Sequence, residues 1–520
     1  MRKKLILLGI DGGTWKLINP LKDEGWLPTF QELTDQGTEG TLISTIPPNT
    51  YPAWTSIFTG TNTGKHGIAD IMIRKDNSTF GAATSNNRMV DSVWRILSNF
   101  GLRSIVVNDP VTYPPEKING VMTTGLSTPF GSQNFVYPKE LRDDLNRVAH
   151  SYECDIPIDF DEMVAVNKNQ AYEKLLEFAE KIAKCSLYLA RNYEWDVLAV
   201  IFTSTDRLQH FFWNDIRYVK NHYKWLDATV REFLELEPDA NIIGVSDHGF
   251  GPLTKCFYIN NWLSLLGLVK LEKSTLRSLM SRFNLTYQRI VQMLLRLKLY
   301  QPVAKLTPRG IKRRTPISNL EKKASIYYDK SIAYSLNTNG GIFINDKMVN
   351  DREKEKCKHL VSTKLQKVID EGAPIISNVY YNNEVLRGPH THRGADILLL
   401  PREGYEISSS LYSSGIFGPP IATKAPRTGT HQPEGIFFAC GPHIKKRCIL
   451  NSNVNTWDIA PTILHMLGLP IPDYMDGRVL KEIFRKGTIP DRRPVKLQKY
   501  SKFTKAKLLR KLATKRQAAH

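Results

Sequence analysis

Short apolar runs, separated by longer amphipathic segments, dominate the first 250 residues of this chain. The runs have the length of buried strands and cover residues 4–10, 104–108, 196–203 and 241–246, while helical periodicity covers residues 90–100, 170–192 and 213–237. Strands that are apolar along their whole length are buried on both faces, as in a parallel sheet covered by helices. We therefore predict a layered α/β fold with a mostly parallel central sheet.

Acidic and imidazole side chains follow these runs where each strand is expected to end. Asp11 follows the first run, Asp206 the third, and Asp247 and His248 the fourth. Ligands of open α/β sheets bind at the carboxyl ends of the strands. We therefore expect these side chains to lie along one edge of the sheet.

Each of these motifs admits two interpretations when taken alone. Asp206 and His210 are four residues apart and share one face of a helix, which suits either a metal site or a salt link on the helix surface. Asp247 and His248 lie at a strand-to-loop corner, which suits either a metal site or the capped start of a helix. His431 lies in a glycine-bounded turn, and a lone histidine is more often structural.

Taken together, the candidates supply three carboxylates and three imidazoles: Asp11, Asp206, Asp247, His210, His248 and His431. Such nitrogen and oxygen donors suit two zinc or manganese ions, and a pair of divalent ions can clamp the oxygens of a phosphoryl displacement. Thr50, two residues before Pro52, is a candidate nucleophile at a helix N-terminus. The alternative is that Thr50 only caps that helix.

The net charge of +20 is concentrated in two segments. Residues 270–323 contain 14 basic and 2 acidic residues, and residues 485–520 contain 13 basic and 1 acidic. The rest of the chain is nearly neutral, which argues against nucleic acid as a partner of the protein body. The basic segments suit contact with an anionic membrane surface, and the second also suits a frayed, solvated tail.

The sequence contains no apolar stretch of the roughly 18 residues that a membrane span needs. The N-terminal apolar run, residues 5–10, is too short for a signal peptide, and the six cysteines are scattered without a CxxC pair. We therefore expect a cytoplasmic protein, or one held peripherally on the inner face of the membrane. The oligomeric state stays open.

The same changes in composition suggest the domain boundaries. We expect a core in two parts, residues 1–269 and 326–480, interrupted by a basic and mainly helical inserted cap at 270–325. Residues 481–520 are expected to form a flexible basic C-terminal tail.

Several short motifs follow one another along the chain: Gly9-Ile10-Asp11-Gly12, Asn49-Thr50-Tyr51-Pro52, His66-Gly67-Ile68, Asp206 to His210, Ser246-Asp247-His248-Gly249 and Gly429-Thr430-His431. In this order they resemble the type I phosphodiesterase/nucleotide pyrophosphatase family of the alkaline phosphatase superfamily. The resemblance covers about residues 4–480 apart from the insertion. It implies an alkaline-phosphatase-like core with three α/β/α layers.

The resemblance also implies a role for each candidate residue. Two divalent ions, Zn²⁺ or alternatively Mn²⁺, would be bound, the first by Asp206, His210 and His431 and the second by Asp11, Asp247, His248 and Thr50. The Thr50 hydroxyl would attack phosphorus and form a phospho-threonine intermediate, which water then hydrolyses.

The chain departs from the family pattern at residue 70. Family members place an asparagine soon after the His-Gly-Ile triplet, where its amide donates to a phosphoryl oxygen, but here the stretch reads Ala69-Asp70-Ile71-Met72. We predict that Asp70 and Arg74 contact the substrate, with Arg74, Lys75 or a main-chain N–H as the replacement donor. His66, beside a glycine, is expected to be structural.

These inferences predict a metal-dependent phosphodiesterase or nucleotide pyrophosphatase that acts on a phosphate-ester small molecule. The alternative is a transferase that moves a phospho-substituent to a lipid-linked or glycan acceptor at a membrane surface, which the basic segments favour. A non-catalytic binding protein that keeps the fold and a hydrolase of monoesters are further alternatives.

Overall fold

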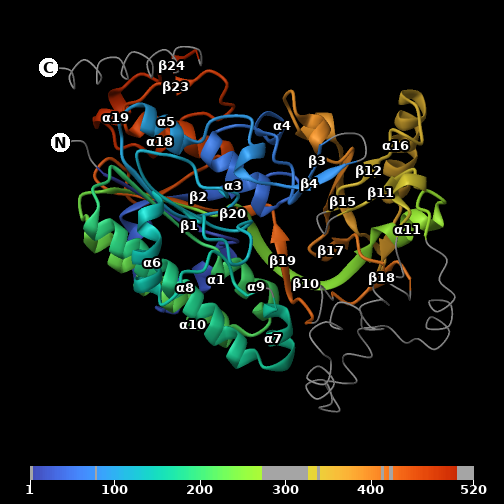
Figure 1. Cartoon of the computed structure of the whole chain (residues 1–520), viewed down its shortest axis with the longest axis horizontal. Helices are drawn as coiled ribbons and strands as arrows, with labels where there is room; N and C mark the ends of the chain where they lie inside the picture. Colours follow the sequence, from blue (N-terminus) through green and yellow to red (C-terminus); the bar gives the residue numbers. More distant parts are fainter. Residues whose placement is uncertain are drawn as a thin grey trace.

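The computed structural model describes residues 4–75, 79–157, 159–271, 326–336, 340–411, 415–420 and 425–499. The inserted cap expected at 270–325 therefore lies almost wholly outside the described residues, and so does the end of the expected tail, residues 500–520. The described part forms two lobes. The larger is built around one extended sheet, and the smaller is drawn at the right of Figure 1.

A ten-stranded sheet forms the centre of the larger lobe, with the order β21-β2-β20-β9-β1-β8-β5-β6-β7 and β22 paired with β2. The strands are β1 Leu5–Ile10, β2 Gly37–Ile43, β5 Ser104–Asp109, β6 Gly120–Thr124, β7 Val136–Tyr137, β8 Val197–Phe202, β9 Asn241–Val245, β20 Glu434–Cys440, β21 Cys448–Ile449 and β22 Val454–Asn455. The five central strands β6, β5, β8, β1 and β9 are parallel to one another, whereas β20 is antiparallel to β2 and β9 and β7 is antiparallel to β6. The predicted mostly parallel sheet is confirmed.

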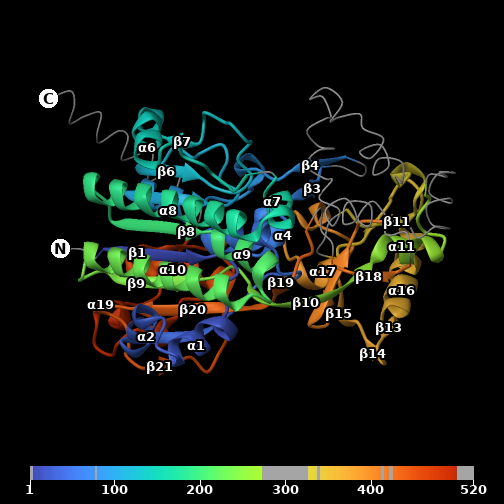
Figure 2. The same ribbon diagram turned by 90° about the horizontal axis from the view of Figure 1, so that it is seen from below.

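Helices cover both faces of this sheet, as Figures 1 and 2 show. One face carries α1 Trp15–Asp23, α2 Pro28–Asp35, α6 Arg142–Ala149, α8 Lys168–Asn192 and α10 Ile216–Leu236. The other carries α3 Thr50–Thr59, α5 Val93–Asn99 and α18 Ile459–Met466. Because successive strand side chains point to opposite faces, Ile6 and Leu8 of β1 enter the first core while Leu5 and Leu7 enter the second.

The smaller lobe has an apolar core of its own. Its four-stranded sheet contains β10 Gly249–Tyr258, β17 Gly404–Ser408, β18 Phe417–Gly418 and β19 Gly429–Gln432, and around it lie α11 Ile259–Leu265, α16 Asp351–Leu365, β15 Ile376–Tyr381 and β16 Ile397–Pro401. β10 starts directly after β9 of the main sheet and extends into this lobe. The segment predicted as one unit, residues 326–480, is therefore divided between the lobes, since β20 onward returns to the main sheet.

The individual elements predicted from the sequence are present. The four predicted strands correspond to β1, β5, β8 and β9, each within one residue of the expected bounds, and the three helical patterns correspond to α5, α8 and α10. Residues 481–499, by contrast, are folded onto the larger lobe, where β24 Leu497–Gln498 pairs with β23 Ile471–Pro472 and Phe484 is buried. No described helix combines the length and the apolar character that a membrane crossing requires.

Candidate active site

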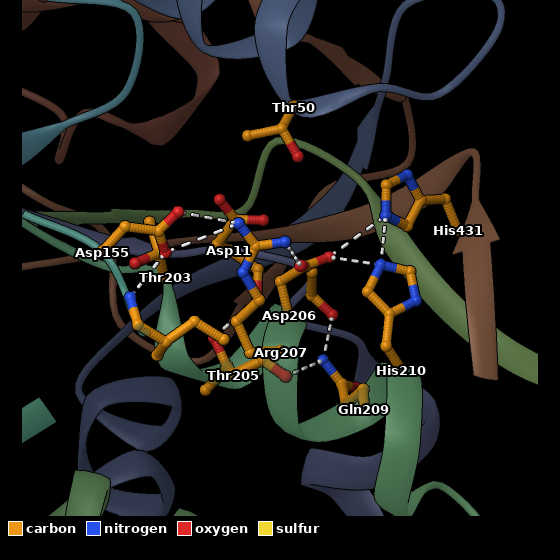
Figure 3. A network of polar contacts seen from close by, with 12 residues as sticks. Asp11, Thr50, Asp155, Thr203, Thr205, Asp206, Arg207, Gln209, His210 and His431 are labelled. Carbon is orange, nitrogen blue, oxygen red and sulfur yellow. Dashed lines mark hydrogen bonds and ion pairs between the residues drawn. The ribbon is translucent and has the colours of Figure 1, made fainter. Parts of the chain in front are cut away.

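The strand ends bring the candidate side chains together at one edge of the main sheet. Asp11 follows β1, Asp206 lies in the first turn of α9 Ser204–Phe212 after β8, and Asp247 and His248 link β9 to β10. His431 comes from β19, which pairs antiparallel with β10 and so returns to the same edge. Figure 3 shows Thr50, Asp206 and His431 converging there from three different elements.

Asp206, His210 and His431 form a first cluster of donor atoms. The Nε2 atoms of the two histidines are 3.1 Å apart, and Asp206 Oδ1 is 3.3 Å from His210 Nε2 and 3.1 Å from His431 Nε2. Donors bound about 2.0 Å from one tetrahedral ion are separated by about 3.3 Å. The spacing therefore matches that of ligands around a single ion.

Asp11, Asp247 and His248 form a second cluster. His248 Nε2 lies 3.2 Å from Asp247 Oδ2 and 3.7 Å from Asp11 Oδ1. These two carboxylate oxygens are buried and have no hydrogen-bond partner in the described part of the chain, although the second oxygen of each accepts from Trp54 Nε1 or the Gly12 amide. Leaving buried acceptors unsatisfied is costly, and a shared cation would satisfy both.

The three imidazoles are held in one orientation by the backbone. Each Nδ1 lies within hydrogen-bond distance of a carbonyl oxygen: His210 at 3.1 Å from Gly429 O, His248 at 3.0 Å from Gly249 O, and His431 at 3.2 Å from Pro48 O. When Nδ1–H donates to a carbonyl, the Nε2 lone pair is left free to bind a metal. All three Nε2 atoms point into the clusters, so this part of the site fits a divalent cation.

Burial sets the protonation of these groups. It lowers the pKa of His210 to about 3, with the Arg427 charge acting in the same direction, and it lowers the pKa of His248 well below its usual value. Burial also raises the pKa of Asp11, as does the neighbouring charge of Asp247, and it raises the pKa of Asp247 to about 7. His210 and His248 are thus neutral, and burial favours the protonated forms of Asp11 and Asp247.

Thr50 is the first residue of α3 and is buried beside the second cluster. Its Oγ1 lies 3.3 Å from His248 Nε2. The residue that caps α3 is Asn49, whose side-chain oxygen accepts from the Tyr51 amide. The alternative that Thr50 only caps the helix is therefore wrong, because the neighbouring residue has that role.

Asp70 and Arg74, the predicted substrate contacts, have different surroundings. Asp70 Oδ1 accepts from Asn49 Nδ2 at 3.1 Å and from the Ile71 amide at 2.6 Å, so it supports the residue that caps α3. Arg74 is buried, with Nη2 paired to Asp396 Oδ2 at 2.8 Å in the smaller lobe, and it does not line the cavity above Thr50.

His66 is buried, as expected for a structural residue. Its Nδ1 accepts from the Ile68 amide at 3.1 Å, and its Nε2 lies 3.0 Å from Ser56 Oγ. Both ring nitrogens are therefore used within the larger lobe, away from the two clusters.

A cavity of about 300 Å³ opens above Thr50 and the first cluster. Two arginines that the sequence analysis did not single out, Arg207 and Arg427, line it. Each is close in sequence to a candidate ligand, since Arg207 directly follows Asp206 and Arg427 precedes His431 by four residues. That proximity is the signal that could have identified them.

The fold matches that of a solved structure. The structure of human ectonucleotide pyrophosphatase / phosphodiesterase 5 aligns with this chain with a TM-score of 0.54 and 12% identity, covering 93% of this chain and 100% of the human chain. The fold is thus alkaline-phosphatase-like. No curated protein matches the sequence.

The family model of type I phosphodiesterase / nucleotide pyrophosphatase matches residues 5–433. The chain belongs to this family. It is accordingly a hydrolase of the phosphodiesterase/pyrophosphatase type, from a family that is generally metal-dependent and acts on phosphodiester or nucleotide small molecules.

Proposed function

We propose that this protein hydrolyses small-molecule phosphodiesters with Thr50 as the nucleophile and with two divalent ions, Zn²⁺ or Mn²⁺. One observation carries the proposal: a buried threonine hydroxyl at the start of a helix lies within hydrogen-bond distance of the His248 imidazole, beside two clusters that together contain three imidazoles and three carboxylates. The ions would be held by two sets of residues, Asp206, His210 and His431, and Asp11, Asp247, His248 and Thr50. Bound there, the ions would stabilise the charge on the phosphoryl oxygens and lower the pKa of the Thr50 hydroxyl.

The chain's own residues position the nucleophile. The N-terminus of α3 favours negative charge on Thr50 Oγ1, and the bonds of Asn49 to the Tyr51 amide and to Asp70 fix the first turn of that helix. Oγ1 loses its proton to solvent and attacks phosphorus as the bond to the leaving oxygen breaks, and the leaving group takes a proton from solvent. Water then hydrolyses the phospho-threonine diester, which releases a phosphomonoester and restores the hydroxyl.

The test compares bis(4-nitrophenyl) phosphate with 4-nitrophenyl phosphate, with zinc or manganese added. We expect the wild type to prefer the diester and Thr50→Ala to lose at least about 10³-fold in kcat, since the substitution removes the hydroxyl that lies beside His248. Thr55→Ala is the matched control, because Thr55 lies on the same helix but donates to the Tyr51 carbonyl.

Full activity of Thr50→Ala would overturn the assignment of the nucleophile. A preference for the monoester would overturn the diesterase assignment. The cytoplasmic location and the membrane contact expected from the basic segments, which lie mostly outside the described residues, stay predictions.

A further inference from the structure

Arg207 and Arg427 approach the first cluster through different ligands. Arg207 Nη1 lies 3.8 Å from Asp206 Oδ2, and Arg427 Nη2 lies 3.1 Å from His210 Nε2. Both line the cavity of about 300 Å³ above Thr50. Two guanidinium groups therefore border the space in which a substrate of Thr50 must lie.

Each guanidinium is anchored by one carboxylate and keeps N–H groups to spare. Arg207 is held by Asp155, with Nη2 at 3.1 Å from Oδ2, and Arg427 is held by Glu406, with Nη1 at 2.7 Å from Oε2. The Nε atoms of both arginines are buried and have no hydrogen-bond partner in the described part of the chain. Because an arginine has five N–H donors, each can hold its carboxylate and still donate to a ligand.

The acidic side chains of the cavity wall have partners within the protein. Glu406 binds Arg427 and also lies 3.3 Å from Thr430 Oγ1, and Asp70 accepts from Asn49 and the Ile71 amide. These bonds direct the carboxylates toward protein donors. Among the described residues that line this cavity, the two guanidinium groups are the cationic donors that remain for an anion.

The anchor of Arg207 also connects two cavities. Asp155 lines a second and larger cavity of about 640 Å³, bordered by Phe130, Tyr152 and Cys154. Arg207 lines the smaller cavity and Asp155 the larger, so their ion pair stands between the two. A substituent that extends from a phosphorus at Thr50 toward Asp155 and the larger cavity therefore approaches Arg207.

We propose that Arg207 and Arg427 form an anion-binding pair, and that the substrate is a phosphodiester whose substituent carries a second anionic group, a carboxylate or a phosphate. This inference rests on the proposed phosphodiesterase function. Arginine binds both groups through paired N–H donors, and such charge-assisted bonds are stronger than bonds between neutral groups. The pair thus determines specificity at a distance from the reacting phosphorus.

The experiment compares three esters with the same leaving group: methyl, 2-carboxyethyl and 2-phosphonoethyl 4-nitrophenyl phosphate. For the wild type, we expect kcat/KM for at least one of the two doubly anionic esters to exceed that for the methyl ester by about tenfold or more. The carboxylate and phosphonate arms show which group is recognised. Arg207→Gln and Arg427→Gln should each lower the ratio of kcat/KM for the preferred anionic ester to kcat/KM for the methyl ester toward 1.

The preference is a ratio measured within each variant, so partial loss of folded protein does not change it. Arg217→Gln is the matched control, because Arg217 is exposed and pairs with Asp215 on the surface, far from both cavities. Arg207→Lys should keep part of the preference, since the charge stays but the paired donors are lost. A wild-type ratio near 1, or a ratio that neither Gln substitution lowers, would overturn the inference.

A binding measurement distinguishes failure of the anion-pair inference from failure of the proposed phosphodiesterase function. If the metal-loaded wild type hydrolyses none of the three esters, the phosphodiesterase proposal is wrong. Calorimetric binding of methyl phosphate and 2-carboxyethyl phosphate to the Thr50→Ala protein then tests the anion pair alone. Tighter binding of the second compound, lost in the added Arg207→Gln substitution, would support the pair, and equal binding would overturn it.

Discussion

Asp247→Asn should stabilise the ion-free protein and reduce the stabilisation that divalent ions provide. In the ion-free protein, the buried Oδ2 atom of Asp247 has no donor in the described part of the chain and lies 3.2 Å from His248 Nε2. Replacing this carboxylate with a neutral amide removes a buried charge without a cation, while Oδ1 can still accept from the Gly12 amide. We expect the free energy of unfolding to rise by about 1–3 kcal/mol.

In the presence of metal, the same substitution removes a ligand. An ion at about 100 times its Kd stabilises the folded state by about 2.7 kcal/mol. With an unfolding entropy of about 2.1 cal/mol/K per residue, the 520 residues give roughly 1.1 kcal/mol/K, so each ion raises the Tm by about 2.5 °C. The wild type should gain about 5 °C with both sites filled, and Asp247→Asn about half of that.

The assay is thermal unfolding followed by circular dichroism, with chelator and then with zinc or manganese, together with metal analysis of the dialysed protein. Metal content should fall from about two ions to about one per chain. Asp143→Asn, on the exposed start of α6, is the control. An equal metal-dependent gain in Tm for Asp247→Asn and the wild type would refute the assignment of Asp247 as a ligand.

Three further predictions concern groups around the site. Burial raises the pKa of Asp109 to about 8. The folded protein therefore binds one proton more than the unfolded chain between about pH 4 and pH 8, and its stability falls as the pH rises through this range. Unfolding measured at several pH values should show that Asp109→Asn gains up to about 1.4 kcal/mol per pH unit relative to the wild type. His66→Phe loses the ring contacts to Ser56 and the Ile68 amide and should destabilise by about 1–3 kcal/mol, with kcat per folded molecule unchanged. Asn49→Ala removes the cap of α3 and should cost about 1 kcal/mol, with kcat falling about tenfold while metal analysis shows the ions retained.

The donor clusters could be predicted from sequence because their members are local to strand ends. A buried strand followed by a polar side chain places that side chain at the edge of the sheet whatever the rest of the fold does. Asp11 after β1 and Asp247 after β9 are of this kind, and the spacing of Asp206 and His210 on α9 aligns the third carboxylate with an imidazole. For these residues, local geometry was sufficient.

The division into two lobes could not be predicted in the same way. The alternation of strand and helix patterns along the chain does not show that β10 leaves the main sheet, because the carboxyl end of β9 and the start of β10 are adjacent in sequence. The apolar side chains of the segment 326–411 could equally extend the core of the main sheet or form a second core. The choice is made by long-range pairing, such as that of β10 with β17.

Closeness in sequence to an expected site residue predicts the cavity position of some arginines correctly and of others wrongly. Arg74 lies close in sequence to the expected phosphoryl donor, yet β3 Met72–Arg74 directs it to Asp396 across the boundary with the smaller lobe. Arg207 and Arg427 lie 220 residues apart and meet only because α9 and β19 both approach the first cluster. The anchor of Arg427, Glu406, comes from β17 of the smaller lobe. Five of the six acidic and imidazole side chains proposed as ligands thus come from α9 and the ends of the main-sheet strands, whereas His431 and the anchor of Arg427 depend on how the smaller lobe packs against that sheet.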